Sequence, residues 1–237
     1  MIIHLIASPR NVSTALMYSL GQHTLIHPID EPFYAAYLAQ SGANHPDREL
    51  ILNNLPHDRS EVFDRIRALE SKHSAIFIKN MAHHLVEDDF RQMDQWKHVF
   101  LIRHPRLHIH SFSQVITNPN LEALGTTTQR QWYDILRQRN RVAHIIDANH
   151  LLKDPKAELR RLCHNMGIGF QSSMLRWPEG PKSFDGCWAS HWYQSAWKTT
   201  RFGPPRDPLS VELPGHLQPL YKACMIDYQY LYNQIKP

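Results

Sequence analysis

Cysteine and long apolar runs are both scarce in this 237-residue sequence. The three cysteines, Cys163, Cys187 and Cys224, are odd in number and far apart, so they do not form the pattern of a disulfide framework. No apolar run approaches the roughly 20 residues that a transmembrane helix needs. The opening MIIHLIASPR holds too short an apolar run for a secretory signal peptide. We therefore expect a cytoplasmic protein without a membrane partner.

Charge of a single sign is also lacking. The 26 basic and 22 acidic side chains leave a formal charge of +4, and the sequence holds no long run of like charges. This balance argues against a nucleic-acid partner and is compatible with a small anionic ligand. The 17 histidines are scattered, and pairs such as His83-His84 lack the cysteine or carboxylate companions of a zinc site. We therefore expect no metal.

Five short apolar runs predict buried strands. Each is brief, rich in β-branched or aromatic residues, and nearly continuous rather than alternating. This pattern is typical of strands that are covered on both faces, as in a parallel sheet between two layers of helices. The five runs are residues 2–7, 25–29, 75–79, 99–102 and 144–148.

Segments with helical periodicity alternate with these runs. The clearest is 155–166, where Asp154 can serve as N-cap, Pro155 as first helical residue and Gly167 as terminator. Strands that alternate with helices indicate an α/β fold. We expect a three-layer sandwich with a central parallel sheet of about five strands, similar to that of P-loop nucleotide triphosphatases. The other predicted helices are residues 13–22, 61–70, 129–142 and 217–235.

Proline and glycine gather in one long irregular segment, residues 177–214. Neither an internal repeat nor a low-complexity linker divides the chain, so we expect residues 1–237 to form a single domain. Long loops on sheets of this kind often close over a ligand. We expect the segment 177–214 to do so.

The loop after the first predicted strand, SPRNVST, leads straight into a helix. A strand, a tight loop and a helix N-terminus together bind phosphate through backbone N–H groups and the helix dipole. The nucleotide-triphosphatase pattern GxxxxGK[ST] places a lysine where this chain has Ser13. ATP hydrolysis is therefore disfavoured, although Ser13 and Thr14 can also be simple helix caps. The candidate phosphate ligands in this loop are Arg10, Asn11, Ser13 and Thr14.

A second candidate anion site lies in the segment HVFLIRHPRLHIHSF. The predicted strand ends at Arg103, a helix starts at Pro105, and Ser111 follows on that helix. Arginine offers a rigid, charged fork and serine an additional donor to a dianionic group. A surface ion pair for Arg103 is the alternative interpretation.

These two segments, in this order, resemble the two nucleotide-binding signatures of sulfotransferases. The stretch ASPRNVSTALMYSL resembles their 5'-phosphosulfate loop, and Arg103 with Ser111 resembles the pair that holds the 3'-phosphate. The stretch IIDANHLLKDPKAELRRLCHNMGI is a third, weaker match. The resemblance covers about residues 1–170. It implies transfer of a sulfuryl group from 3'-phosphoadenosine 5'-phosphosulfate (PAPS), without a metal, to a hydroxyl or amine of a small-molecule or carbohydrate acceptor.

Sulfuryl transfer needs a group that removes the proton of the acceptor and positive charge near the leaving group. Some sulfotransferases carry a histidine base in a Lys-x-His motif, and others carry a base in a Glu-Pro motif. Glu31, which precedes Pro32, and His83 are therefore equal candidates for the base, with His84 as a further one. Lys79 is the candidate for contact with the leaving group. Ordinary surface histidines and helix-start acids remain the alternative.

The stretch KTTRFG is a near-match to the purine-binding loop of sulfotransferases, which makes Arg201 and Gly203 nucleotide-binding candidates. An aromatic cluster just before it can stack on adenine, line the acceptor pocket or simply pack locally. The cluster comprises Trp188, Trp192, Tyr193 and Trp197.

Two other functions stay open at this stage. A P-loop-type nucleotide kinase requires the missing lysine and an acidic magnesium ligand, for which Asp147 is a faint candidate. A sulfotransferase-like domain that binds the nucleotide without catalysis is the other, because a binding site does not guarantee turnover. The sequence identifies neither the acceptor nor the oligomeric state.

Overall fold

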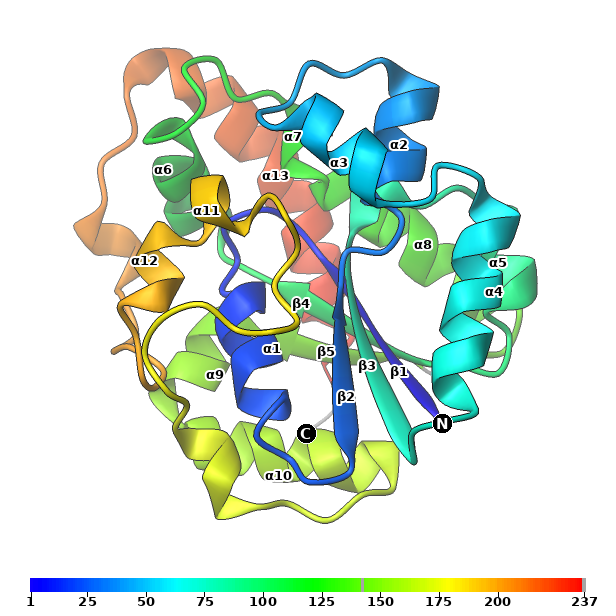
Figure 1. The fold of residues 1–237 in the computed structure, drawn as a ribbon. Coiled ribbons are helices and arrows are strands. Elements are labelled where there is room, and N and C mark those ends of the chain that lie inside the picture. Colours follow the sequence, from blue (N-terminus) through cyan, green and yellow to red (C-terminus); the bar gives the residue numbers. More distant parts are fainter. Residues whose placement is uncertain (142, 236–237) are drawn as a thin grey trace.

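Five parallel strands form the middle of the molecule (Figure 1). The computed structural model describes residues 1–141 and 143–235. The strand order is β2-β3-β1-β4-β5, so β1 lies at the centre and pairs with β3 and β4. This confirms the predicted parallel sheet, with small shifts at the strand ends. The strands are β1 (Ile2–Ala7), β2 (Ile26–Asp30), β3 (Ala75–Met81), β4 (Lys97–Ile102) and β5 (His144–Asp147).

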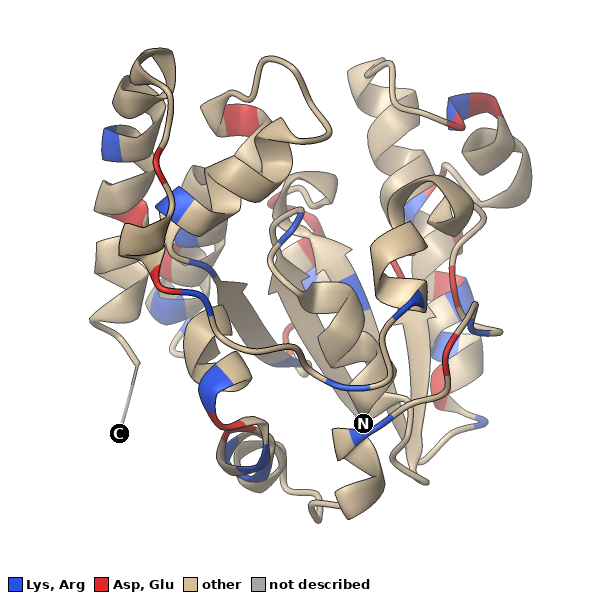
Figure 2. Ribbon diagram, turned by 90° about the vertical axis from the view of Figure 1, so that its left-hand side faces the viewer, with Lys and Arg blue, Asp and Glu red and all other residues tan. Residues whose placement is uncertain are grey.

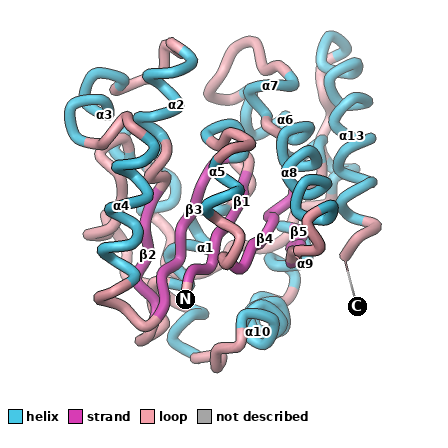
Figure 3. Tube along the Cα trace, turned by 90° about the vertical axis from the view of Figure 1, so that its right-hand side faces the viewer, coloured by secondary structure: helices cyan, strands magenta, loops and turns pink. Residues whose placement is uncertain are grey.

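Helices cover both faces of the sheet, which gives the predicted three layers (Figure 3). Alternate residues of β1 enter different cores: Leu5 packs on one face and Ile6 on the other. The face of Leu5 is covered by α1 (Ser13–Leu20), α9 (Ala148–Lys153) and α10 (Pro155–Met166). The face of Ile6 is covered by α4 (Arg59–Glu70), α5 (Asp89–Gln92), α8 (Thr126–Gln138) and α13 (Gln218–Tyr232).

The helix α10 begins and ends where its local sequence signals predict. The Asp154 side chain accepts a hydrogen bond from the Ala157 N–H at 3.0 Å, and Gly167 terminates the helix with a φ of 69°. Helix α8 starts three residues before the predicted position 129 and ends at Gln138. Residue 142, the predicted end of that helix, lies outside the described residues.

Several shorter elements follow the strands at the carboxyl edge of the sheet or connect the larger helices. These elements are α2 (Tyr34–Ser41), α3 (Arg48–Asn54), α6 (Pro105–Ser113), α7 (Leu121–Leu124), α11 (Ala189–Trp192), α12 (Gln194–Trp197), and the 3₁₀ turns Ala82–His84, Ser172–Leu175, Pro208–Ser210 and Gly215–Leu217. Within residues 1–141 and 143–235, no helix combines the length and the apolar character needed to cross a membrane.

The segment 177–214 is more ordered than its composition predicts, because it contains α11 and α12. It passes in front of α1 and returns to the carboxyl edge of the sheet (Figure 1). Asp185 fixes it by accepting hydrogen bonds from the Tyr18 hydroxyl at 3.0 Å and from Trp197 Nε1 at 2.9 Å. We name this segment the strap.

A chain of polar side chains is buried within the sheet, on the face of Ile6. His98 Nε2 lies 3.2 Å from the Met93 carbonyl, so it carries the proton and His98 Nδ1 is the acceptor. His4 Nδ1 then donates to His98 Nδ1 at 3.1 Å, and Asn80 Nδ2 donates to His4 Nε2 at 3.0 Å. Each hydrogen bond therefore determines which ring nitrogen of the next histidine carries the proton. Both imidazoles are neutral.

This chain predicts a loss of stability in mild acid. Burial lowers the pKa of His98 to about 4, while an unfolded histidine titrates near pH 6.5. Between those values the unfolded state binds a proton that the native state does not, so the unfolding free energy falls as the pH falls. We expect His98 to contribute a loss of about 3 kcal/mol between pH 6.5 and 4.

Urea unfolding of the wild type and of a His4→Leu/His98→Leu double variant across this pH range measures the effect. Other buried histidines also contribute, so the decisive quantity is the difference between the two proteins in the slope of unfolding free energy against pH. The double variant should show the shallower slope. Equal slopes would contradict the assignment of His4 and His98 as neutral buried groups.

Candidate functional site

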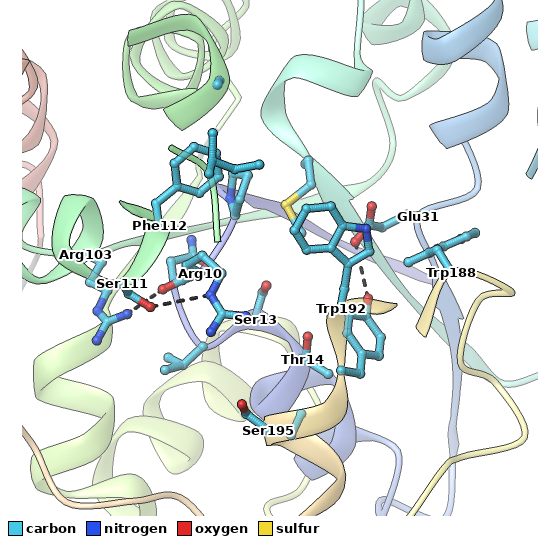
Figure 4. Close-up of a pocket in the computed structure, with 18 of the residues that line it drawn as sticks. Arg10, Ser13, Thr14, Glu31, Arg103, Ser111, Phe112, Trp188, Trp192 and Ser195 are labelled. Atoms are coloured by element: carbon cyan, nitrogen blue, oxygen red, sulfur yellow. Dashed lines mark hydrogen bonds between the residues drawn. The ribbon is translucent and has the colours of Figure 1, made fainter. Parts of the chain in front are cut away.

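A cavity of about 590 Å³ opens at the carboxyl edge of the sheet. Parallel strands end together at this edge, so the segments after β1, β2, β3 and β4 all reach the cavity. The strap closes another side of it with residues of α11 and α12. Figure 4 shows two distinct ends: Arg10, Arg103 and Ser111 gather at one, and Glu31 with Trp188 lies at the other.

The loop after β1 leaves its hydroxyl groups available to the cavity. The N-cap of α1 is Val12, with a left-handed φ of 66° and no side-chain capping bond, so Ser13 and Thr14 are not the caps. Both line the cavity (Figure 4). Without a capping side chain, the first N–H groups of α1 and the positive end of its dipole are left to bind an anion. The predicted strand–loop–helix context is therefore present.

Asn11 plays a different part from its neighbours in this loop. Its side chain is buried, and Nδ2 donates to the Leu101 carbonyl of β4 at 2.6 Å. This bond anchors the loop against the sheet, and a ligand role for Asn11 stays a prediction. Asn11 still forms part of the cavity wall.

Two guanidinium groups meet at the other end of the loop. Arg103 donates a hydrogen bond to the Arg10 carbonyl, and Arg10 Nε lies 3.4 Å from Ser111 Oγ. The ion pairs formed by the described residues include neither arginine, so the alternative of a surface ion pair for Arg103 is wrong. Burial, with Arg10 and Arg206 nearby, lowers the pKa of Arg103 to about 10.

This arrangement is electrostatically incomplete. Arg10 and Arg103 are half-buried cations that repel each other, and burial removes part of the water that would screen them. Asp147 opposes this effect at Arg103, but the two do not form an ion pair. An anion bound between Arg10, Arg103 and Ser111 would relieve that cost. The predicted pair of Arg103 and Ser111 is thus brought together, on the same side of the cavity as the α1 N-terminus.

The predicted purine-binding residues Arg201 and Gly203 line the same cavity, on the stretch of the strap that follows α12. Both residues are exposed. Ser195 of α12 lines this wall as well (Figure 4). The sequence analysis missed Ser195, because a serine between two tryptophans carries no recognisable signal.

The opposite end of the cavity contains a buried cluster of charged groups. Lys79 Nζ lies 2.6 Å from Asp30 Oδ1 and 2.7 Å from Glu31 Oε1. It also donates to the Tyr193 hydroxyl, which belongs to the strap. The Lys79 side chain is completely buried. Direct pairing of β2 with β3, in which Asp30 faces Lys79, creates this contact.

The surroundings of Lys79 bear on its predicted role. Its ammonium is enclosed by Asp30, Glu31 and Tyr193, which occupy its three donor positions. Burial lowers the pKa of Lys79, but the two carboxylates outweigh burial and the net shift is upward. Contact of Lys79 with a leaving group stays a prediction, and in this structure its donors face the two acids and the tyrosine.

Of the three charged groups in this cluster, Glu31 lines the cavity, as does the neutral Tyr193. Burial raises the pKa of Glu31; Lys79 opposes that rise and Asp30 adds to it. Its backbone has a φ of 41°, an uncommon conformation for a residue other than glycine, and its N–H donates to the Lys79 carbonyl at 2.8 Å. A carboxylate with a raised pKa at a cavity wall accepts a proton more readily than an ordinary carboxylate does.

The second predicted base, His83, is less suited to that task. Burial, together with His45, lowers the pKa of His83 to about 3, and burial also lowers the pKa of His84 well below its usual value. Both imidazoles are therefore neutral and weakly basic at pH 7. His84 Nδ1 lies 3.6 Å from Glu31 Oε2, beyond hydrogen-bond distance. Both histidines line the cavity.

Aromatic rings form the rest of this end. Tyr34 and Tyr37 of α2 stack on His84, with ring centroids 4.5 and 4.9 Å apart. Trp188 and Trp192 extend the wall from the strap (Figure 4). The sequence analysis identified the tryptophans but missed the two tyrosines. Their spacing of three residues directly after Glu31 was the available signal, because it places both rings on one face of a helix.

Outside the cavity, residues of both charge signs occur together. In the view of Figure 2, basic and acidic residues are interspersed along the outer helices and loops. Among the residues that the structure describes, no three histidine, cysteine or carboxylate side chains are grouped as metal ligands.

Comparison with known proteins was made on both sequence and structure. The family model described as "Sulfotransferase domain" matches residues 1–231. Two Arabidopsis thaliana proteins, branched-chain-amino-acid aminotransferase-like proteins 2 and 1, are 36% and 34% identical to this chain over 206 residues. The match covers 86% of this chain but only 37% of each of those proteins. The chain therefore spans little more than a third of the curated relatives it matches.

Two solved structures share the fold. The sulfotransferase domain of the Synechococcus PCC 7002 olefin synthase superposes with a TM-score of 0.64 at 20% identity, covering 100% of this chain and 96% of that chain. The sulfotransferase domain from the curacin biosynthetic pathway gives a TM-score of 0.59 at 18% identity, covering 99% and 98%. At these identities the likeness supports the architecture alone.

The packing of the strap against the site can be tested at Gly186. A Cβ at this position would lie 2.2 Å from the Trp188 ring, whose side chain is almost fully buried. We expect Gly186→Ala to lower the unfolding free energy by about 1–3 kcal/mol through overpacking. Gly215→Ala is the matched control, because its added Cβ meets no atom within 4 Å. Denaturant unfolding that leaves both variants equally stable would contradict this packing.

Proposed function

Because the chain belongs to the sulfotransferase family, we propose that it transfers a sulfuryl group from PAPS to a hydroxyl or amine of a small-molecule or carbohydrate acceptor. The observation that carries this proposal is the pair Arg10 and Arg103, two guanidiniums that form no ion pair with an acid of the described residues and lie beside an uncapped helix N-terminus. A nucleotide with phosphate at two positions supplies the negative charge that this end of the cavity lacks.

The residues present fit such a donor. Arg10, Ser13 and Thr14, with the first N–H groups of α1, would hold the phosphosulfate. Arg103 and Ser111 would hold the 3'-phosphate, since an arginine fork and a hydroxyl suit a dianion. Arg201 and Gly203 would lie against the purine. When bound, the donor supplies the sulfuryl group and a phosphate leaving group.

Glu31 is the proposed base. It stands at the cavity wall with a raised pKa, whereas the pKa of His83 is lowered to about 3. A hydroxyl nucleophile beside Glu31 would lose its proton to the carboxylate as it attacks. Arg10 and the positive end of α1, rather than the enclosed Lys79, would stabilise charge on the leaving group.

The acceptor end supports only a broad substrate class. Tyr34, Tyr37, Trp188 and Trp192 offer ring faces and edges, and the nearby histidines are neutral. Such a wall suits stacking on a planar group or on the apolar face of a sugar. A cytoplasmic location and a single domain over residues 1–237 stay predictions. The name of the longer plant relatives assigns no aminotransferase activity to this chain.

Loss of Arg103 should weaken nucleotide binding. Isothermal calorimetry with 3'-phosphoadenosine 5'-phosphate should detect binding by the wild type. Arg103→Ala should weaken it about 10- to 100-fold, because one charge-assisted contact to a phosphate is removed. The control is Arg91→Ala, whose side chain is 75% exposed on α5. No binding by the wild type, or equal binding by both variants, would overturn the proposed donor site.

Replacement of Glu31 should separate binding from transfer. Glu31→Gln should still bind 3'-phosphoadenosine 5'-phosphate but transfer labelled sulfate from PAPS into a metabolite extract about 100- to 10,000-fold more slowly. Wild-type transfer should rise with pH, because the base acts when deprotonated. His83→Gln tests the rival base: a loss confined to that variant would move the role to His83. Nucleotide binding without transfer by the wild type would indicate the non-catalytic alternative.

A further inference from the structure

Tyr193 of the strap joins the charged cluster from a position far along the chain. Its hydroxyl accepts from Lys79 Nζ and lies 2.9 Å from Asp30 Oδ2 and 3.3 Å from Glu31 Oε1. The Tyr193 ring also lies under the ammonium, 4.8 Å from Nζ to the centroid. The residue is buried. A neutral hydroxyl thus completes a site that otherwise holds two acids and one base.

The hydrogen bonds distinguish the two adjacent carboxylates. Asp30 accepts from Lys79 on Oδ1, and its Oδ2 accepts from the Gly186 N–H at 3.1 Å and faces the Tyr193 hydroxyl. Two of these three donors come from the strap. Glu31 Oε1 contacts Lys79 and the more distant Tyr193 hydroxyl, while Glu31 Oε2 lies 3.6 Å from the neutral His84. Both oxygens of Asp30 therefore accept close hydrogen bonds, whereas one oxygen of Glu31 accepts none from the described residues, and Glu31 is the carboxylate left to exchange a proton.

We propose that Tyr193 is a positioning residue. Its hydroxyl bonds to the Asp30–Lys79 pair and so holds Glu31 at the cavity wall, where Glu31 removes the proton of the acceptor. The proposal rests on the role given to Glu31 above and adds a strap residue to it. Without the hydroxyl, the third donor of Lys79 loses its partner and Asp30 loses one of its donors. Lys79 is then free to shift between the two acids, and Glu31 loses a fixed orientation.

The placement of Tyr193 also links the two ends of the cavity. It lies between α11 and α12, and α12 carries Ser195 on the donor side. Arg201 follows on the same strap. Residues of one segment, the strap, therefore line both ends of the cavity.

The test follows the Glu31 carboxyl directly. Protein labelled with ¹³C at glutamate side-chain carboxyls is titrated by NMR, and the Glu31 signal is assigned by its loss in Glu31→Gln. The groups that face Glu31 are Asp30, Lys79, Tyr34, His84 and Tyr193. The Tyr193 hydrogen bond lowers the pKa of Glu31. Tyr193→Phe should therefore raise that pKa further and move the acid limb of turnover to higher pH, with kcat lower by about 10- to 100-fold.

The matched control is Tyr18→Phe. It also removes one tyrosine–aspartate hydrogen bond that holds the strap, the bond to Asp185, but outside the charged cluster. Tyr18→Phe should leave the Glu31 titration unchanged, and both variants should bind 3'-phosphoadenosine 5'-phosphate like the wild type. An unchanged Glu31 pKa in Tyr193→Phe, or the same shift in both variants, would overturn the positioning role. Failure of the wild type to bind the nucleotide would instead defeat the proposed function, whatever the titration shows.

Discussion

The burial of one ammonium group organises the functional end of this molecule. Lys79 lies two residues before the end of β3 with no exposed side-chain surface, and a charge in that position is tolerated only with an anion in contact. Asp30, its neighbour in the sheet register, provides that anion. Glu31 and the strap then complete the shell around it. The conformation of Asp30 and Glu31, the position of the strap and the shape of the acceptor wall all depend on this ion pair.

The two ends of the cavity carry excess charge of opposite sign. At the arginine end, Arg10 and Arg103 lie close together without an ion-paired acid among the described residues. At the other end, Glu31 is a second acid beside a single lysine. Both arrangements cost folding free energy in the ligand-free protein. Such costs persist where binding a ligand offsets them, which is why strained charge arrangements gather at functional sites.

Local sequence signals predicted the features that depend on local structure. The strands appear as apolar runs because both their faces are covered, and α10 has both a cap and a terminator. By contrast, the N-cap residues of α2 and α3, Phe33 and Asp47, make no side-chain capping bond, so the starts of these helices do not depend on a local cap. The positions of Arg10 and Arg103, the proposed donor ligands, were predictable because each lies in a stretch that directly follows a strand. The enclosure of Lys79 was not, because it depends on which strands are neighbours and on Tyr193, 114 residues away.

The buried chain of His4, His98 and Asn80 has a consequence for how the sheet assembles. His4 stands directly opposite His98 in the pairing of β1 with β4, and Asn80 projects from β3 on the same face. A slip of one residue between any two of these strands would turn a polar group toward the wrong face and leave its partners unsatisfied. Apolar neighbours alone would tolerate such a slip far better. The polar chain therefore favours the native strand register. That register places the loops at the carboxyl edge beside one another.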